Sequence, residues 1–146
     1  MKYSSYFCIR FSAQQTHTAK TEKTHLTRQI YHIMTLREIT KIINGQILSG
    51  EDRLDEEITQ AVASDLMSEV LTLKTSPLLI TGLCNMQTIR TCDMACIDHI
   101  VIVRNKKPND EMLELAQENG MVIITSEYSL FKACGLLYAA GLQAIY

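Results

Sequence analysis

The stretch EITQAVASDLMSEVLTLKTSPLLITGL, residues 57–83, has the pattern of a strand, a helix and a second strand. Residues 57–63 alternate and end on small side chains, as a strand does before a tight turn. Ser64 and Asp65 are suitable N-caps for the helix that follows. Residues 78–80 form an apolar run suited to a strand buried on both faces. Because two parallel strands joined by one helix form a right-handed crossover, the stretch predicts a parallel sheet.

Similar patterns flank this unit on both sides. Further helices are predicted between Thr35 and Gly45, from Asn85 to Met94, at residues 109–119 and from Ser126 to near Gly135, and further strands at residues 46–48, 99–103 and 121–124. Strands that alternate with helices of this length predict a three-layer α/β domain. We expect a mainly parallel sheet of about four to five strands with helices on both faces.

The charge divides the chain into two parts. Residues 1–33 hold five Lys or Arg and one Glu, a net charge of +4, whereas residues 34–146 hold nine against fifteen acids, a net charge of −6. The basic part lacks a sustained apolar period, so we expect little stable structure there. It is either a targeting leader or an extension upstream of the true start. We favour the extension, because Met34 opens the first well-patterned element, and the domain then spans residues 34–146.

The composition limits the kinds of partner. An acidic domain argues against nucleic-acid binding, which needs a clustered basic face. No apolar run approaches the roughly 20 residues that a membrane span requires, so no membrane partner is expected. The five cysteines are odd in number and lack paired spacing, which argues against a disulfide framework and favours the reducing cytoplasm.

A ligand site is expected where the parallel strands end, because loops and helix N-termini expose backbone N–H groups there. The residues that follow the predicted strands are Ser64, Asp65, Thr81, Gly82, Arg104, Thr125 and Ser126. Their hydroxyls, guanidinium and backbone could hold a small polar or anionic ligand. The alternative is that Ser64, Asp65 and Ser126 only cap helices, which is the commoner role of such residues.

Catalytic and cofactor motifs are absent from the sequence. No G-x-G-x-x-G follows a strand, and neither G-x-x-x-x-G-K-[ST] nor G-x-S-x-G occurs. His99 is the only histidine of residues 34–146, so no catalytic histidine pattern is present. We therefore expect neither an enzyme nor a bound cofactor.

A cysteine cluster supports a second hypothesis. Cys92 and Cys96 lie one helical turn apart, and Cys84 precedes that helix. With Cys134 or His99 as a fourth ligand they could form a zinc or iron–sulfur site, and the chain would be a redox- or metal-responsive sensor. Because no C-x-x-C pair occurs and cysteine often packs as a small apolar residue, we expect no metal site.

The order of several blocks resembles the DRTGG domain family. The blocks are ASDLMSE at residues 63–69, LLITGL at 78–83, IRTCDMACIDHIVIV at 89–103, ELAQENG at 114–120 and TSEYSLFKACGLLY at 125–138. Members similar to this chain are small stand-alone proteins, and the domain also accompanies phosphotransacetylases and CBS-domain pyrophosphatases. The resemblance implies a fold like that of the HPr kinase N-terminal domain and a non-catalytic, regulatory or oligomerising role.

The motif that names the family is only partly present. Where the family has Asp-Arg-Thr-Gly-Gly, this chain has Asp65, Leu66, Met67, Ser68 and Glu69. Asp65 matches, and Ser68 keeps a hydroxyl nearby and joins the candidate site residues. Leu66 stands where the family motif has arginine, so an anion held by that arginine is not expected, and Glu69 would repel an anion.

The C-terminal segment GLLYAAGLQAIY, residues 135–146, is unusually apolar for a chain end. Its large apolar residues are Leu136, Leu137, Tyr138, Leu142, Ile145 and Tyr146. They either form a homodimer interface or pack on the sheet of the same chain. The leading hypothesis is thus a regulatory or sensory module that dimerises and binds a small ligand or a protein partner.

Overall fold

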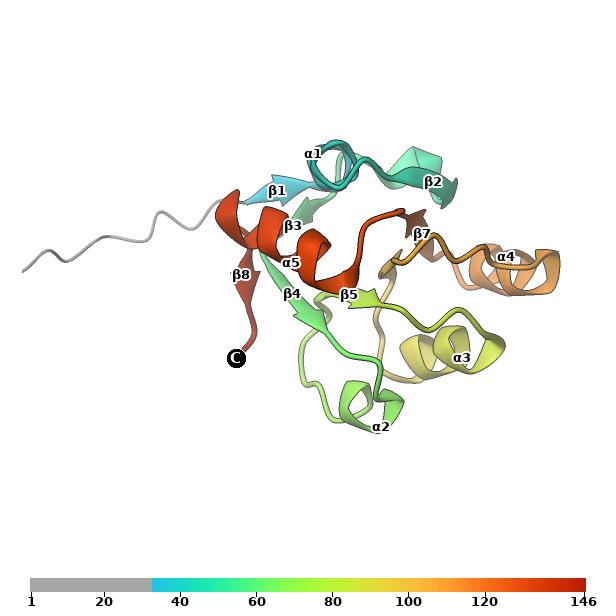
Figure 1. The fold of residues 1–146 in the computed structure, drawn as a ribbon. Helices are drawn as coiled ribbons and strands as arrows, with labels where there is room; N and C mark the ends of the chain where they lie inside the picture. Colours follow the sequence, from blue (N-terminus) through green and yellow to red (C-terminus); the bar gives the residue numbers. More distant parts are fainter. Residues whose placement is uncertain (1–32) are drawn as a thin grey trace, which may run out of the picture.

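A computed structural model of the protein describes residues 33–146, and the predicted leader, except for Ile33, lies outside the described residues. The strands of the central sheet lie in the order β2 (Gln46–Ser49), β7 (Val122–Thr125), β6 (His99–Ile102), β5 (Leu78–Thr81), β4 (Gln60–Ala63) and β8 (Gln143–Ala144) (Figure 1). Only β2 runs antiparallel to its neighbour, β7. The prediction of a mainly parallel sheet is confirmed, with six strands in place of four to five.

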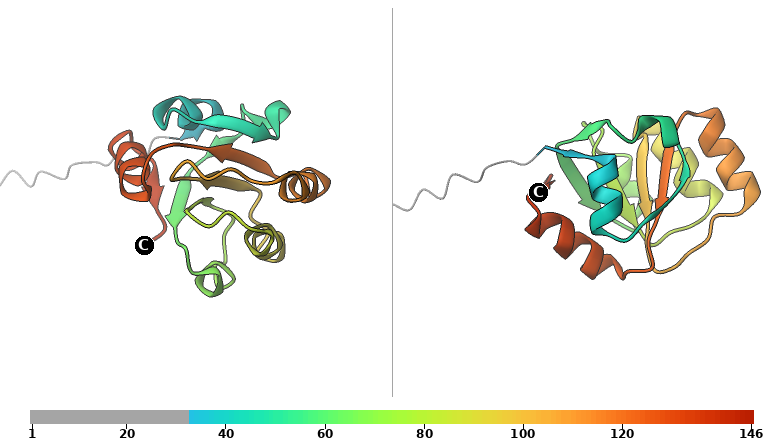
Figure 2. Two further views of the ribbon diagram at one scale, coloured as in Figure 1. Left: turned by 45° about the vertical axis from the view of Figure 1, so that its right-hand side comes forward. Right: turned by 90° about the horizontal axis from the view of Figure 1, so that it is seen from above.

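Helices cover both faces of this sheet. One face carries α2 (Met67–Val70), α3 (Met86–Met94) and α4 (Asp110–Glu118), and the other carries α1 (Leu36–Ile42) and α5 (Leu130–Ala139) (Figure 2). Strands β4 to β7 are neighbours in chain order, so their right-handed crossovers place α2, α3 and α4 on one face. The chain then returns from β7 to β8, beside β4, and α5 accordingly lies on the opposite face.

The apolar side chains form a core on each face of the sheet. Strand β5 is buried along its whole length, as a central parallel strand should be. Leu78 and Ile80 belong to the core beneath α1 and α5, and Leu79 belongs to the core beneath α2, α3 and α4. The strand alternation therefore supplies both layers with apolar side chains from one element.

Residues 57–83 differ from their predicted structure in two places. Residues 57–63 form two short strands, because β3 (Glu57–Ile58) pairs antiparallel with β1 (Met34–Thr35) in a separate small sheet and only β4 joins the central sheet. The helix that follows has four residues, and Leu66 is its N-cap, without a side-chain hydrogen bond. The prediction that Ser64 and Asp65 cap this helix is wrong.

The other helix starts can be compared in the same way. Thr35 caps α1 and forms a capping box with Glu38, and Asn85 caps α3. The last helix is capped by Ser129, so the prediction of Ser126 is wrong. This helix also continues through Gly135 to Ala139. Within residues 33–146, none of the helices has the length and apolar character that a membrane crossing requires.

Candidate functional site

Asp65 lies directly beyond the carboxyl end of β4 and connects three strand ends. Its Oδ1 accepts hydrogen bonds from the backbone N–H of Gly82, at 2.6 Å, and from the Thr81 hydroxyl, at 3.0 Å. Its Oδ2 accepts from Nη2 of Arg104 at 2.6 Å. We call these residues, Asp65, Thr81, Gly82 and Arg104, the Asp65 cluster. It holds the carboxyl ends of β4, β5 and β6 together, which explains why Asp65 does not cap α2.

The carboxylate of Asp65 is charged at neutral pH. Partial burial raises its pKa, but the hydrogen bonds from Gly82, Thr81 and Arg104 outweigh that effect, and the net pKa lies below its ordinary value. Both of its oxygens are occupied by protein donors. The Asp65 cluster is therefore a structural connection, and its carboxylate is not open to a ligand.

Arg104 reaches Asp65 by lying across Gly82. A Cβ at position 82 would overlap the guanidinium of Arg104, so a larger residue there would displace Arg104 from its present position. Arg104 and Asn105 both have positive φ, +66° and +52°. Their backbone N–H groups donate to the carbonyls of Tyr128, at 2.8 Å, and Ser126, at 3.1 Å. The loop between β6 and α4 is thus fixed against the loop between β7 and α5.

Ser64 and Ser68 contribute less than the sequence suggested. The hydroxyl of Ser64 accepts from the N–H of Leu66 at 2.9 Å and lies 3.0 Å from Oε2 of Glu69, to which it donates. It shapes the turn before α2. Ser68 is exposed on α2. Neither residue belongs to the Asp65 cluster.

Thr125 and Ser126 form a separate group at the end of β7. The buried hydroxyl of Ser126 donates to the carbonyl of Ile43 at 2.6 Å and accepts from the N–H of Tyr128 at 3.2 Å. Thr125 pairs with Gln46 of β2. The Ser126 hydroxyl therefore holds the α1–β2 connection against the end of β7. This explains why it does not cap α5.

This second group borders the largest of the described cavities, about 590 Å³ in volume. The cavity lies beyond the carboxyl ends of β6 and β7, and we call it the β6–β7 cavity. Its polar lining includes Asn105, Lys106, Lys107, Thr125 and Glu127. Lys106 and Lys107 were not among the predicted site residues, although their position in the loop after a predicted strand is a signal that could have identified them.

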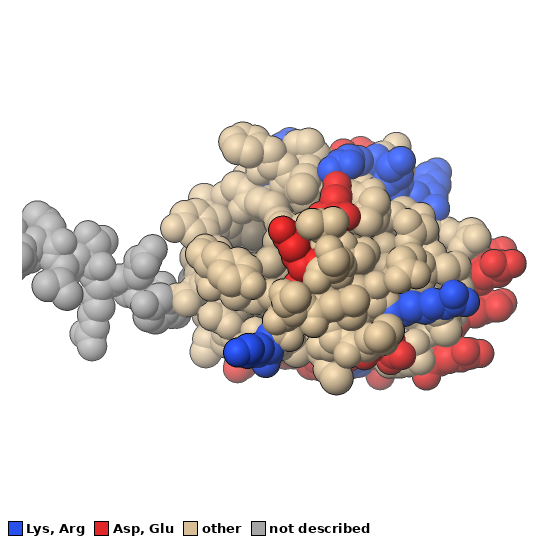
Figure 3. Space-filling model, turned by 90° about the horizontal axis from the view of Figure 1, so that it is seen from below, with Lys and Arg blue, Asp and Glu red and all other residues tan. Residues whose placement is uncertain are grey.

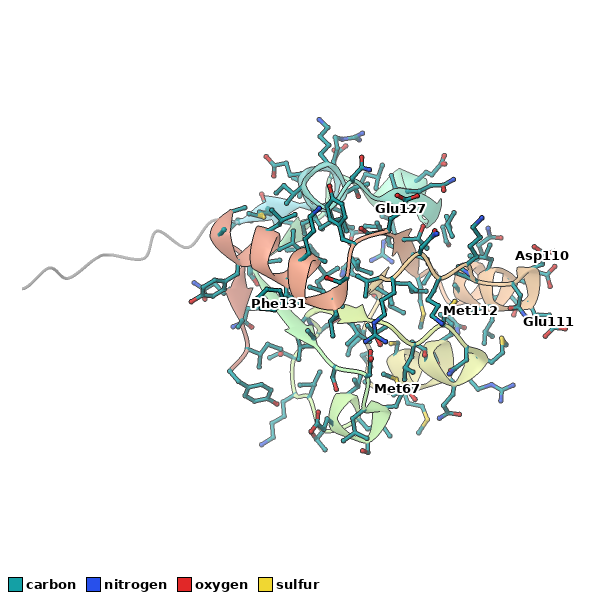
Figure 4. All side chains as sticks on the ribbon, viewed as in Figure 1. Met67, Asp110, Glu111, Met112, Glu127 and Phe131 are labelled. Atoms are coloured by element: carbon teal, nitrogen blue, oxygen red, sulfur yellow. The ribbon has the colours of Figure 1, made fainter. Side chains whose placement is uncertain are left out.

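An apolar groove lies on the opposite face, between α5, β4 and the edge strand β8. Its volume is about 300 Å³, and we call it the α5 groove. Ala61 and Ala63 form its floor, and Phe131, Tyr138 and Leu142 form its sides. Phe131 projects from the first turn of α5 beside β4 (Figure 4). Small side chains on β4 leave this space open.

A third group of polar residues lies at the amino ends of the strands. Arg53 donates from Nε to Glu56 Oε1 at 2.6 Å, and its Nη2 lies 3.6 Å from Asp98. Oε2 of Glu56 lies 2.8 Å from Nε2 of His99. The hydrogen bond from Arg53 is the main reason that the pKa of Glu56 falls to about 2. We call Arg53, Glu56, Asp98 and His99 the amino-end network.

The cysteines do not form a metal centre in the part of the chain that the structure describes. Within residues 33–146, no group of three or more His, Cys, Asp or Glu side chains could hold a metal ion. Burial raises the pKa of the Cys92 thiol to about 12, and it also raises the pKa of Cys84 and Cys134. Raised thiol pKa values reduce the thiolate fraction on which metal binding and redox reactivity depend.

The distribution of charged side chains on the surface agrees with the acidic composition of residues 34–146. Figure 3 shows one face of the molecule that is largely free of charge, with acidic side chains gathered at the end where α4 lies. The acidic residues of α4 include Asp110 and Glu111 in its first turn. The same view shows basic side chains gathered along the upper right edge of this face.

Comparison with known proteins identifies the family. The family model for the DRTGG domain matches residues 38–140. The chain belongs to the DRTGG domain family. Among curated proteins no sequence matches it significantly.

A solved structure shares the fold. It contains the CBS and DRTGG domains of the regulatory region of Clostridium perfringens pyrophosphatase, complexed with the activator diadenosine tetraphosphate. The sequences are 18% identical, the TM-score is 0.59, and the match covers 82% of this chain and 51% of the other. This chain thus spans about half the length of that structure, and the likeness concerns the α/β fold alone.

Proposed function

We propose that this DRTGG-family chain is a non-catalytic regulatory module that binds a small anionic ligand at the carboxyl edge of its sheet and self-associates through α5. The observation that carries the ligand part is the β6–β7 cavity, which combines a ligand-sized volume with exposed Lys106 and Lys107. Carboxyl ends of parallel strands are the usual place for ligands in open α/β sheets.

The structural neighbour supports a ligand of this charge. The pyrophosphatase regulatory region is complexed with an activator that carries four phosphates, diadenosine tetraphosphate. A DRTGG domain thus occurs in a protein region that responds to a small polyanion. The same class of effector is the natural first choice for a stand-alone domain with two lysines at its cavity.

Self-association is supported by the apolar surface around the α5 groove. Phe131 is 90% exposed, Tyr138 62% and Tyr146 90%. Phe131 and Tyr138 line the same groove, and exposed apolar surface of this kind often marks an interaction site. A second copy of the chain would cover Phe131 and Tyr138 together with the edge strand β8, and we propose a homodimer on this surface.

The ligand part is tested by thermal shift with the full chain. The panel contains ATP, diadenosine tetraphosphate, acetyl phosphate, inorganic pyrophosphate and zinc chloride. Binding to the folded state raises the melting temperature, and the rise at 100 times Kd corresponds to about 2.7 kcal/mol. We expect a rise with at least one phosphate compound and none with zinc. A flat response to the whole panel would contradict ligand binding and favour a protein partner.

The homodimer is tested by sedimentation velocity at about 50 μM. The wild type is expected to sediment as a dimer and the Phe131→Glu variant as a monomer, since a charge in an apolar interface opposes its burial. Met94→Glu is the matched control, because Met94 is 75% exposed but lies on α3, across the sheet. A monomeric wild type, or equal effects of the two variants, would contradict the proposed interface.

A further inference from the structure

The β6–β7 cavity lies where the connections of two neighbouring strands part. The chain leaves β6 towards α4 on one face of the sheet, and it leaves β7 towards α5 on the other face. Loops that diverge in this way leave a crevice between them, and open α/β sheets bind ligands at such points. The connections that follow β4, β5 and β6 all run to the face that carries α2, α3 and α4. Among the parallel strand pairs of the described sheet, only β6 and β7 are followed by connections that run to opposite faces.

The cavity has a size and a rigid frame suited to a ligand. Its volume of about 590 Å³ falls within the roughly 300–1,000 Å³ of small-molecule sites. Arg104 and Asn105 begin the β6–α4 loop in the left-handed conformation, held by the carbonyls of Tyr128 and Ser126. Asp65 holds the Arg104 side chain from the other side. The loop that carries Lys106 and Lys107 is therefore attached at its start, and less ordering is needed on binding.

The charges of the cavity select the kind of ligand. Arg37, Arg53 and Arg104 each have a carboxylate partner, whereas no ion pair is found for Lys106 or Lys107 within residues 33–146. Two lysines that are adjacent in the sequence and line one cavity can neutralise a phosphate with charge-assisted hydrogen bonds.

A single carboxylate, that of Glu127, also lines the cavity, and it would accept a hydrogen bond from a hydroxyl or amino group of the ligand. Asp110 and Glu111, in the first turn of α4, do not line the cavity, and Figure 4 shows them apart from Glu127.

The rest of the lining is mixed, with the polar residues Asn44 and Gln46 beside an apolar part. The apolar part consists of Leu48 from β2, Leu113 from α4 and Pro108 from the loop before α4. A free inorganic anion would leave this apolar part uncovered, while an organic group attached to a phosphate would bury it. We propose that the β6–β7 cavity binds a phosphorylated organic molecule of nucleotide size, with Lys106 and Lys107 at its phosphates and its organic group against Leu48 and Leu113.

This proposal rests on the proposed function and assigns its ligand to one place. The test uses the full chain labelled with ¹⁵N, titrated with ATP, with inorganic tripolyphosphate and with adenosine, and followed by amide chemical shifts. ATP is expected to move the amides of residues 44–48, 105–107 and 125–127. ATP should bind more tightly than tripolyphosphate or adenosine, because only ATP contacts both the lysines and the apolar part.

Charge reversal provides the matched variants. The Lys106→Glu/Lys107→Glu variant should lose affinity for ATP about ten-fold or more, equivalent to at least one charged contact. Lys41→Glu/Lys74→Glu changes the net charge equally at lysines that do not line the cavity and should bind like the wild type. All four lysines are exposed, and the dispersion of the amide spectrum shows directly that each variant is folded.

The outcomes separate this proposal from the general function. If ATP moves only amides near Asp65, Gly82 and Arg104, a regulatory ligand site stands but its assignment to the cavity is wrong. Equal affinity for ATP and tripolyphosphate would overturn the role of Leu48 and Leu113. Equal loss of affinity in both lysine variants would reduce the effect to net charge. No movement with ATP or tripolyphosphate would overturn this proposal, whereas the ligand part of the proposed function is overturned only by a flat thermal-shift response to the whole panel.

Discussion

The two ends of the sheet use their charges differently. At the amino ends, Arg53 contacts Glu56 and Asp98 and also donates to the carbonyl of Gly120, so its charge is compensated within the domain. At the carboxyl ends, Asp65 and Arg104 compensate each other, but Lys106 and Lys107 add positive charge beside a cavity. The charges at the amino end are thus paired within the domain, whereas the carboxyl end also carries two lysines for which no ion pair is found within residues 33–146.

A pair of glycines allows the largest test of this comparison. Gly50, at the amino end, has φ of +79°, and a Cβ there would lie 2.7 Å from Cγ2 and 3.0 Å from Cα of Val122. We expect Gly50→Ala to lower the free energy of unfolding by about 2–3 kcal/mol, because both the left-handed backbone and the contact with a strand oppose the methyl group. Urea denaturation measures the loss.

The Asp65 cluster is the next largest effect. Asp65→Ala removes the acceptor of three hydrogen bonds and leaves the buried Thr81 hydroxyl without it, which should cost about 2 kcal/mol. Arg104→Ala should cost less than about 1 kcal/mol, because the Arg104 side chain is 45% exposed and Asp65 keeps its other two donors.

Urea denaturation of the two single variants and the double variant completes a cycle. Equal losses in the two single variants would mean that the hydrogen bonds of Asp65 with Thr81 and Gly82 add nothing beyond its contact with Arg104.

Gly82→Ala provides the carboxyl-end counterpart of Gly50→Ala. Its Cβ would meet the guanidinium of Arg104, which is the far end of a flexible side chain and can move into solvent. We expect a loss of about 1 kcal/mol or less, measured by the same urea denaturation. A loss as large as that of Gly50→Ala would mean that Arg104 is held more rigidly than its exposure suggests, and the contrast between the two ends would disappear.

Much of the fold follows from local patterns in the sequence. The apolar run of β5, the Asn caps of α3 and α4 and the alternation of strands and helices were sufficient to predict a three-layer α/β domain. The antiparallel position of β2 and the separate pair of β1 and β3 were not predictable, because short strands acquire their partners from the packing of distant segments.

The candidate site was predictable only in part, for a related reason. Asp65, Thr81, Gly82 and Arg104 were chosen as residues at strand ends, and they do meet. Whether such a polar side chain caps its own helix or binds a group from another strand depends on contacts across 17 or 39 residues of sequence, which no local pattern encodes. The same limit applies to Ser126, whose hydroxyl reaches Ile43.

The smallest effect concerns pH at the amino end. The pKa of Glu56 falls from 4.5 to about 2, so its stabilising contribution is complete above the unfolded value and is lost as the pH falls through the folded value. Because Glu56 is 40% exposed, screening by solvent reduces this contribution to less than about 1 kcal/mol. Between pH 5 and pH 2 the free energy of unfolding should therefore fall more for the wild type than for Glu56→Gln. The difference in stability between the two proteins should shrink as the pH falls.

Urea denaturation at a series of pH values measures this difference. Asp55→Asn is the control, since Asp55 is the neighbouring carboxylate, pairs with Arg37 at 3.0 Å and is 82% exposed. Hydrogen bonding to Arg37 also lowers the pKa of Asp55, but an exposed pair contributes little to stability, so its pH profile should stay close to that of the wild type. If the Glu56→Gln and wild-type profiles ran parallel down to pH 2, the amino-end network would not stabilise the fold through Glu56, and the contrast with the carboxyl end would rest on Gly50 alone.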